Sequence, residues 1–111
     1  MSMEQRLFVY GSLRPGGRNQ HALAGIEGSW QRGWVRGRLL EGGWGAAMGY
    51  PAIRLDDSAE AVPGDVLTSS RLDEHWDRLD EFEGDEYRRV LATVRLQDEA
   101  TVQAFVYVLR E

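Results

Sequence analysis

Short apolar runs, separated by glycine, proline and acidic turns, dominate the pattern along the chain. Runs of this kind, rich in β-branched and aromatic residues and bounded by turn formers, are typical of β-strands. The predicted strands span Arg6–Tyr10, Ser29–Leu40, Tyr50–Leu55, Val62–Leu67, Tyr87–Leu96 and Thr101–Leu109. The last strand is apolar at every position from Phe105 to Leu109, which predicts burial on both faces. Trp30 and Trp34, evenly spaced on one strand, are predicted to share a core face.

One later segment follows the period of a helix instead. Between Ser70 and Glu83, the apolar residues Leu72, Trp76 and Leu79 fall within about 60° of one another on a helical wheel. A stripe of this width predicts an amphipathic helix that packs on the core through one side.

Both ends of this helix carry sequence signals. Ser70 is predicted to be the N-cap, with Asp73 completing a capping box. Gly84 is predicted to end the helix in a left-handed conformation, which glycine adopts without steric cost. A second, shorter helix is predicted over Asn19–Ala24.

Glu83 is a charged residue on the apolar side of the predicted helix. It follows Leu72 by eleven residues, which places it about 20° from that leucine on the wheel, whereas Glu81 points to water. Burial disfavours the charged form of a carboxylate and raises its pKa, so Glu83 is a candidate general base. The alternative is that the last helical turn frays, or that Arg88 or Arg89 pairs with Glu83, and the carboxylate has only a structural role.

Glycine is abundant, with 13 copies, and the glycines cluster at predicted turns. Gly33 and Gly37 interrupt a long strand in a way that suits bulges or barrel corners. The first strand runs directly into the loop Tyr10-Gly11-Ser12-Leu13, where glycine lets backbone N–H groups approach an anion such as a carboxylate. The loop lacks the glycine patterns of phosphate loops and the G-x-S-x-G elbow of serine nucleophiles. The alternative is an ordinary glycine turn.

Composition and charge narrow the function classes. The 111 residues have the size of one domain, predicted to span 1–111, and a net charge of −5 argues against nucleic acid as a partner. No cysteine is present, and His21 and His75 lack metal-binding spacing, so neither a metal nor another cofactor is predicted. No apolar run approaches the roughly 20 residues of a membrane span, which predicts a cytoplasmic protein.

Three groups of residues resemble the γ-glutamyl cyclotransferase-like family. They are Phe8–Arg14 with its Tyr-Gly-Ser-Leu, Tyr50-Pro51-Ala52, and Leu79–Gly84 followed by Tyr87-Arg88-Arg89. The resemblance implies an α+β fold, a compact mixed β-barrel with a few short flanking helices. It also implies that the loop of Tyr10, Gly11, Ser12 and Leu13 binds the substrate around its α-carboxylate. Glu83, and not Glu81, matches the family's acid/base, and Tyr50 and Tyr87 are predicted to line the pocket.

The implied reaction cleaves a γ-glutamyl amide by attack of the substrate's own α-amine, releasing 5-oxoproline and a free amine. The expected partner is a small γ-glutamyl substrate, and the protein is expected to be a monomer or a small homo-oligomer. The alternative is a noncatalytic module that keeps the barrel and its anion-binding loop to bind a small metabolite or a protein.

Overall fold

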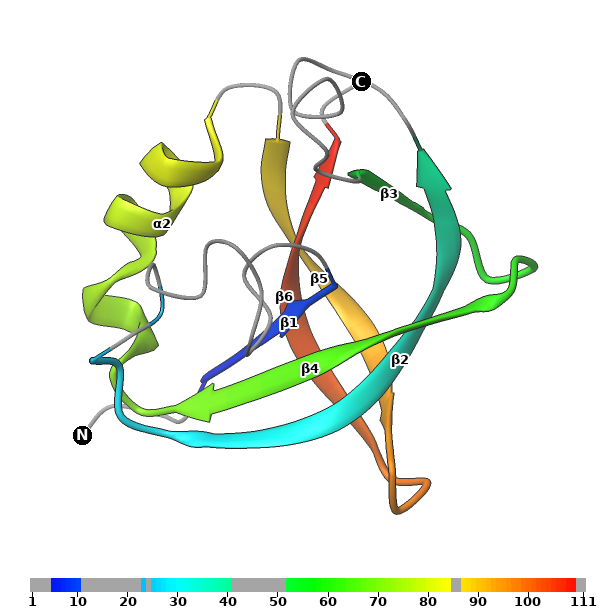
Figure 1. Cartoon of the computed structure of the whole chain (residues 1–111), viewed down its shortest axis with the longest axis horizontal. Helices are drawn as coiled ribbons and strands as arrows, with labels where there is room; N and C mark the ends of the chain where they lie inside the picture. Colours follow the sequence, from blue (N-terminus) through cyan, green and yellow to red (C-terminus); the bar gives the residue numbers. More distant parts are fainter. Residues whose placement is uncertain (1–4, 11–22, 24, 41–51, 85–86, 110–111) are drawn as a thin grey trace.

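Strands form most of the fold (Figure 1). The computed structural model describes residues 5–10, 23, 25–40, 52–84 and 87–109. The described strands are β1 (Gln5–Val9), β2 (Ser29–Leu40), β3 (Ala52–Leu55), β4 (Ala61–Ser69), β5 (Tyr87–Leu96) and β6 (Thr101–Leu109). Between β4 and β5 lie a 3-10 turn, η2 (Leu72–Glu74), and the helix α2 (Trp76–Glu83).

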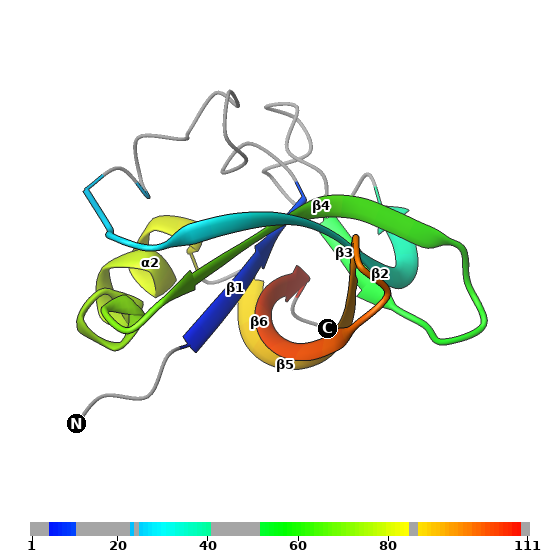
Figure 2. The same ribbon diagram turned by 90° about the horizontal axis from the view of Figure 1, so that it is seen from below.

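The strands close into a mixed β-barrel, as the family resemblance implied. Their order is β3-β2-β4-β1-β6-β5, and an additional pairing of β2 with β5 closes the ring. β1 runs parallel to β6, with Leu7 opposite Phe105, while the other pairings are antiparallel. α2 lies outside the barrel, to one side, in both views (Figures 1 and 2). The expected α+β architecture is therefore confirmed.

Two hydrophobic clusters stabilise this arrangement, because β1 and β6 are buried on both faces. On β1, Leu7 and Val9 join the cluster beneath α2, whereas Phe8 joins the cluster formed by residues of β2 to β6. On β6, Tyr107 belongs to the first cluster and Val106 to the second. The predicted burial of the last strand on both faces is confirmed for Val106, Tyr107 and Val108, while Phe105 is half-buried.

Two glycines face each other where β2 changes partners. Gly33 pairs with Gly64 of β4 and also with Leu96 of β5, at the closure of the barrel. A Cβ atom on Gly64 would lie 2.4 Å from the Phe8 ring, and one on Gly33 would lie 2.8 Å from a Val94 methyl group. Only glycine leaves these two side chains room in the interior, which is why the predicted barrel corner falls here.

The prediction that Trp30 and Trp34 share a core face is wrong. Trp30 is 40% exposed, and Trp34 is half-buried beneath the guanidinium group of Arg95, 6.0 Å from its ring. The even spacing does put both on one face of β2, but it is the outer face. The buried positions of β2 are the odd-numbered ones around Val35. Strand periodicity alone cannot say which face turns inward when the alternate positions are glycines.

The apolar stripe predicted for the helix is confirmed, but the predicted N-cap is wrong. Leu72, Trp76 and Leu79 are buried, but a 3-10 turn precedes the α-helix and neither N-cap position has a side-chain hydrogen bond. Instead of Ser70, Ser69 receives a hydrogen bond from the N–H of Arg71 at 3.0 Å, while its own hydroxyl donates to the carbonyl of Glu27. Ser69 is buried at the end of β4, so its hydroxyl needs partners more than that of exposed Ser70 does.

The strand boundaries agree with the sequence except in β1, β4 and β3. β1 spans Gln5–Val9, one residue earlier at each end than the predicted Arg6–Tyr10. β4 extends on both sides of the predicted Val62–Leu67, because pairing with β1 continues to Ser69 and pairing with β2 begins at Ala61. β3 is described from Ala52, so residues 50 and 51 of the predicted strand lie outside the described residues. The predicted helix over Asn19–Ala24 lies outside them too, except for Leu23, which is buried in a turn.

Candidate active site

Tyr10 lies at the end of β1, where the predicted substrate loop begins. Its hydroxyl donates a hydrogen bond to the backbone carbonyl of Tyr107 on β6 at 2.7 Å. Its ring stacks on that of Phe8, with centroids 6.3 Å apart. These contacts fix the residue from which the loop departs. Gly11, Ser12 and Leu13 lie outside the described residues.

Glu83 is the last residue of α2, as predicted, and its side chain lies outside what the structure describes. Gly84 follows with φ +88° and ψ 179°, so the chain leaves the helix extended at a φ that favours glycine. The Gly84 N–H donates to the carbonyl of Asp80 at 3.1 Å, which closes the final turn. Glu81 is exposed, in agreement with the helical wheel.

Asp80, one turn before Gly84, connects α2 to two strands of the barrel. Its Oδ1 accepts a hydrogen bond from the hydroxyl of Tyr107 at 2.6 Å. The same oxygen lies 3.2 Å from Nε of Arg89 on β5, and Oδ2 accepts from Nη2 of Arg89 at 3.4 Å. The guanidinium group thus meets both carboxylate oxygens, the geometry in which arginine binds carboxylates most specifically.

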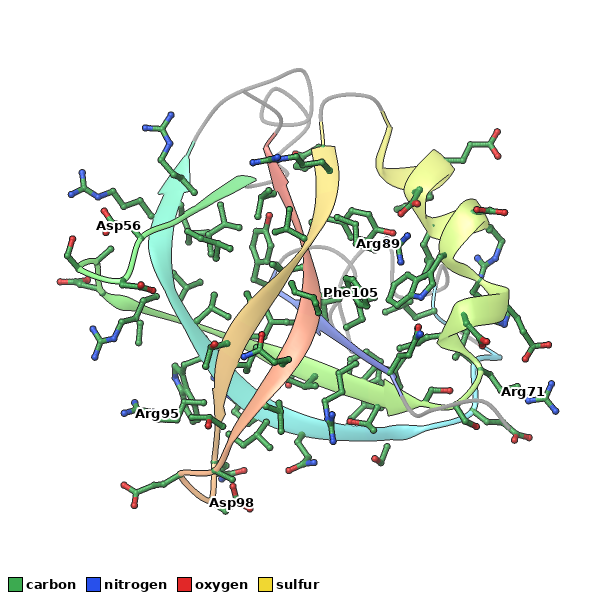
Figure 3. The ribbon with its side chains drawn as sticks, turned by 180° about the vertical axis from the view of Figure 1, so that it is seen from behind. Asp56, Arg71, Arg89, Arg95, Asp98 and Phe105 are labelled. Atoms are coloured by element: carbon green, nitrogen blue, oxygen red, sulfur yellow. The ribbon has the colours of Figure 1, made fainter. Side chains whose placement is uncertain are left out.

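Arg89 is held between the helix and the barrel. Its guanidinium carbon lies 4.2 Å from the centre of the Trp76 ring and 5.0 Å from that of Phe105. The two rings meet edge to face at 5.1 Å, and the Trp76 indole N–H donates to the side-chain carbonyl of Gln5. Figure 3 shows Arg89 and Phe105 in the space between β5, β6 and α2. A guanidinium over aromatic faces is favoured electrostatically, so these rings restrain Arg89 beside Asp80.

Together these contacts join the two sequence motifs that lie farthest apart. Tyr10, which opens the predicted loop, bonds to Tyr107, and Tyr107 bonds to Asp80 on the helix that ends at Glu83. Arg89, expected from the sequence as one of two possible partners for Glu83, pairs with Asp80. Neither Asp80 nor Tyr107 was predicted as a site residue. A signal for Tyr107 existed, because a tyrosine in a strand buried on both faces needs a partner for its hydroxyl.

The structure describes one of the two tyrosines predicted to line the pocket. Tyr87 is 8% exposed and belongs to the cluster beneath α2, where it contributes to the core. Its N–H donates to the carbonyl of Gly84 at 3.2 Å, so it follows directly from the helix end. Tyr50 lies outside the described residues.

A separate hollow of about 450 Å³ is lined mainly by residues of β2 and β5. Its lining includes Trp34, Leu55, Leu91 and Arg95, and neither Tyr10 nor Tyr87 contributes to it. Arg95 lies on the side of the barrel away from α2 (Figure 3). This hollow is therefore distinct from the region around Asp80.

The described part of the chain holds neither a metal-binding cluster nor a membrane-spanning helix. No group of three or more histidine, cysteine, aspartate or glutamate residues there could hold a metal ion. Of the two histidines, His75 lies beside the guanidinium group of Arg78, at 3.2 Å, and His21 is outside the described residues. Among the described residues, no helix has the length and apolar character needed to cross a membrane.

Solved structures with a similar fold come from several organisms. YkqA from Bacillus subtilis is 28% identical with a TM-score of 0.73, and the match covers 97% of this chain and 36% of that chain. An AIG2-like protein from Mus musculus is 24% identical with a TM-score of 0.68, covering 95% and 76%. A structure described as gamma-glutamyl cyclotransferase is 17% identical with a TM-score of 0.67, covering 98% and 68%. The last two show the fold alone. This chain spans about a third of YkqA.

A search of the curated proteins found no match. The sequence does match the family model described as gamma-glutamyl cyclotransferase, AIG2-like, over residues 7–111, a range that includes the Tyr10 loop and the α2 motif. The chain therefore belongs to the gamma-glutamyl cyclotransferase, AIG2-like family.

Proposed function

We propose that this protein is a γ-glutamyl cyclotransferase that converts a γ-glutamyl amide into 5-oxoproline and a free amine. The observation that carries the proposal is the hydrogen-bonded path from Tyr10 through Tyr107 to Asp80. It brings the start of the predicted substrate loop and the helix that ends at Glu83 to one region of the barrel. The family match over residues 7–111 includes both segments.

The reaction needs no nucleophile from the enzyme. The α-amine of the substrate attacks its own γ-carbonyl carbon, a C–N bond forms that closes a five-membered ring, and the original amide C–N bond breaks. Starting from the α-ammonium form, the attacking nitrogen loses two protons as it becomes the ring N–H, and the departing nitrogen gains two as it leaves as an ammonium group, so the reaction balances without a co-reactant. Intramolecular attack in a well-oriented geometry reaches effective molarities of about 10⁵ M or more, so holding the substrate folded supplies much of the rate.

In this proposal Glu83 transfers the proton. Its carboxylate accepts a proton from the α-ammonium group and donates one to the leaving amine, a role worth roughly 10²- to 10⁴-fold in rate. Backbone N–H groups of Gly11, Ser12 and Leu13 bind the α-carboxylate, which orients the amine toward the γ-carbonyl.

The cytoplasmic location, the single domain over 1–111 and the oligomeric state stay predictions.

The test is direct detection of product. The purified protein is incubated with γ-glutamyl amides of amino acids and of simple amines, and 5-oxoproline is measured by mass spectrometry. Wild type is expected to release 5-oxoproline from at least one substrate, Glu83→Gln is expected to release none, and Glu81→Gln, the same change two residues earlier, is expected to keep activity. Binding of γ-glutamyl amides without turnover, equally tight in Glu83→Gln, would instead identify a noncatalytic module.

A further inference from the structure

We propose that Asp80 is a positioning residue. Together with Tyr107 and Arg89, it fixes the helix end that carries Glu83 relative to the strand end from which the substrate loop departs. This inference rests on the proposed function for its catalytic consequence, and on the contacts of Asp80 for its physical basis.

α2 is too short to hold its own geometry. It has eight residues, and isolated helices shorter than about 12 residues are marginal in water. Its buried apolar side chains, Trp76 and Leu79, lie in its first half, and Phe82 is 43% exposed. Among the described side chains of the last turn, Asp80 therefore supplies the polar contacts to the barrel.

The contacts of Asp80 fix the direction of the helix end as well as its distance from the barrel. Asp80 receives hydrogen bonds from two different strands, from the Tyr107 hydroxyl at 2.6 Å on β6 and from Arg89 on β5. Tyr107 is 4% exposed, and Arg89 is restrained by the rings of Trp76 and Phe105. Packing thus restrains both donor side chains independently of their bonds to Asp80.

Tyr107 contacts both parts of the site. The side chain of Tyr107 contacts α2, and its backbone carbonyl accepts the hydrogen bond from Tyr10 at 2.7 Å. A shift of α2 relative to β6 therefore changes the separation between the helix end and the start of the loop. A misplacement of about 1 Å between reacting groups costs on the order of 10²-fold in rate.

The side chain of Asp80 is 43% exposed, which separates positioning from stability. Exposed ion pairs add little to the free energy of unfolding, because water and salt screen them. Replacing Asp80 by asparagine is therefore expected to leave the protein folded while it loosens the angle of the helix end. A residue that only stabilised the fold would lower the melting temperature first and the turnover number only through unfolding.

The kinetic test uses Asp80→Asn, with Asp77→Asn as the matched control. Asp77 is exposed on the same helix, so the control makes the same chemical change away from the barrel contacts. On a γ-glutamyl amide that wild type converts, Asp80→Asn is expected to lower kcat roughly 10- to 100-fold with KM close to wild type. The melting temperature and the kinetics of Asp77→Asn should stay close to wild type. A wild-type kcat in Asp80→Asn, an equal loss in Asp77→Asn, or a change confined to KM would overturn the proposal.

A second measurement does not depend on catalysis. Tyr107→Phe removes only the hydroxyl that bonds to Asp80, and hydrogen exchange by NMR then reports the Gly84 N–H, which bonds to the carbonyl of Asp80. Faster exchange at Gly84 in Tyr107→Phe, but not in Asp77→Asn, is expected if the contact holds the helix end. Unchanged exchange would contradict the positioning role. If wild type converts no γ-glutamyl amide, the proposed function fails, while this measurement still decides whether the contact orders the helix end.

Discussion

Gly64→Ala adds one methyl group where β4 packs tightly against β1. The new Cβ would lie 2.4 Å from the ring carbon Cζ of Phe8 and 2.4 Å from the backbone carbonyl oxygen of Val9. Val9 immediately precedes Tyr10, so the chain that would have to move leads directly into the predicted substrate loop. The substitution therefore tests this packing and the site together.

The size of the effect follows from which atoms can move. To reach 3.0 Å, the Val9 carbonyl must retreat by about 0.6 Å, and a close-packed interior resists such a shift. Overpacking costs about 1–3 kcal/mol and occasionally more. We expect about 3 kcal/mol here, because the Val9 backbone is held in register with Asp65 of β4 and its carbonyl cannot rotate away as a side chain could. Gly33→Ala is the matched control, since its nearest atom, 2.8 Å away, is a side-chain carbon of Val94 and its nearest backbone atom is 3.3 Å away, and about 1 kcal/mol is expected.

Urea unfolding of both variants measures these costs. A loss of 1 kcal/mol lowers the melting temperature of a domain of this size by roughly 4 °C. In a thermal melt, Gly64→Ala should therefore have a midpoint about 12 °C below that of wild type. Adding Phe8→Leu to Gly64→Ala removes the ring atoms but leaves the Val9 oxygen, so it should recover only part of the loss. A cost at Gly64 no greater than that at Gly33, or complete recovery with Phe8→Leu, would refute the reasoning that the backbone carbonyl sets the penalty.

Three further predictions concern the loop, the helix and an exposed turn. Gly11→Val should raise KM for a γ-glutamyl amide in steady-state assays, because a β-branched side chain hinders both the turn and the carboxylate, while Ser12→Ala should be milder. Leu79→Ala should cost about 3 kcal/mol in denaturant melts, since Leu79 is fully buried. The Ser58 hydroxyl and N–H donate to Asp56 at 2.7 and 2.9 Å and hold the pKa of Asp56 below its usual 3.8. A lowered folded pKa stabilises the fold above the unfolded pKa and ceases to do so as pH falls through the folded pKa. In Ser58→Ala, NMR titration should therefore show a higher Asp56 pKa, and its stability deficit should vanish in acid.

The sequence by itself determined the local elements. The bounds predicted for Ser29–Leu40, Tyr87–Leu96 and Thr101–Leu109 are those of β2, β5 and β6. The sequence also predicted the apolar stripe of the helical segment, and Glu83 as the last helical residue before a glycine of positive φ. These features depend on the spacing of apolar residues and on the conformations that glycine permits, both of which are local properties that the chain carries in its order of residues.

Only the tertiary structure decided how those elements meet. The parallel pairing of β1 with β6, the outward face of Trp34 and the use of Ser69 in place of a Ser70 cap depend on contacts between distant segments. So does the bond from Tyr107 to Asp80, which lies 27 residues away in sequence. Spacing indicates which face of a strand or helix is apolar, but it does not say which strand will lie opposite. The partners of a buried hydroxyl or carboxylate are fixed only when packing brings their donors and acceptors within hydrogen-bonding distance.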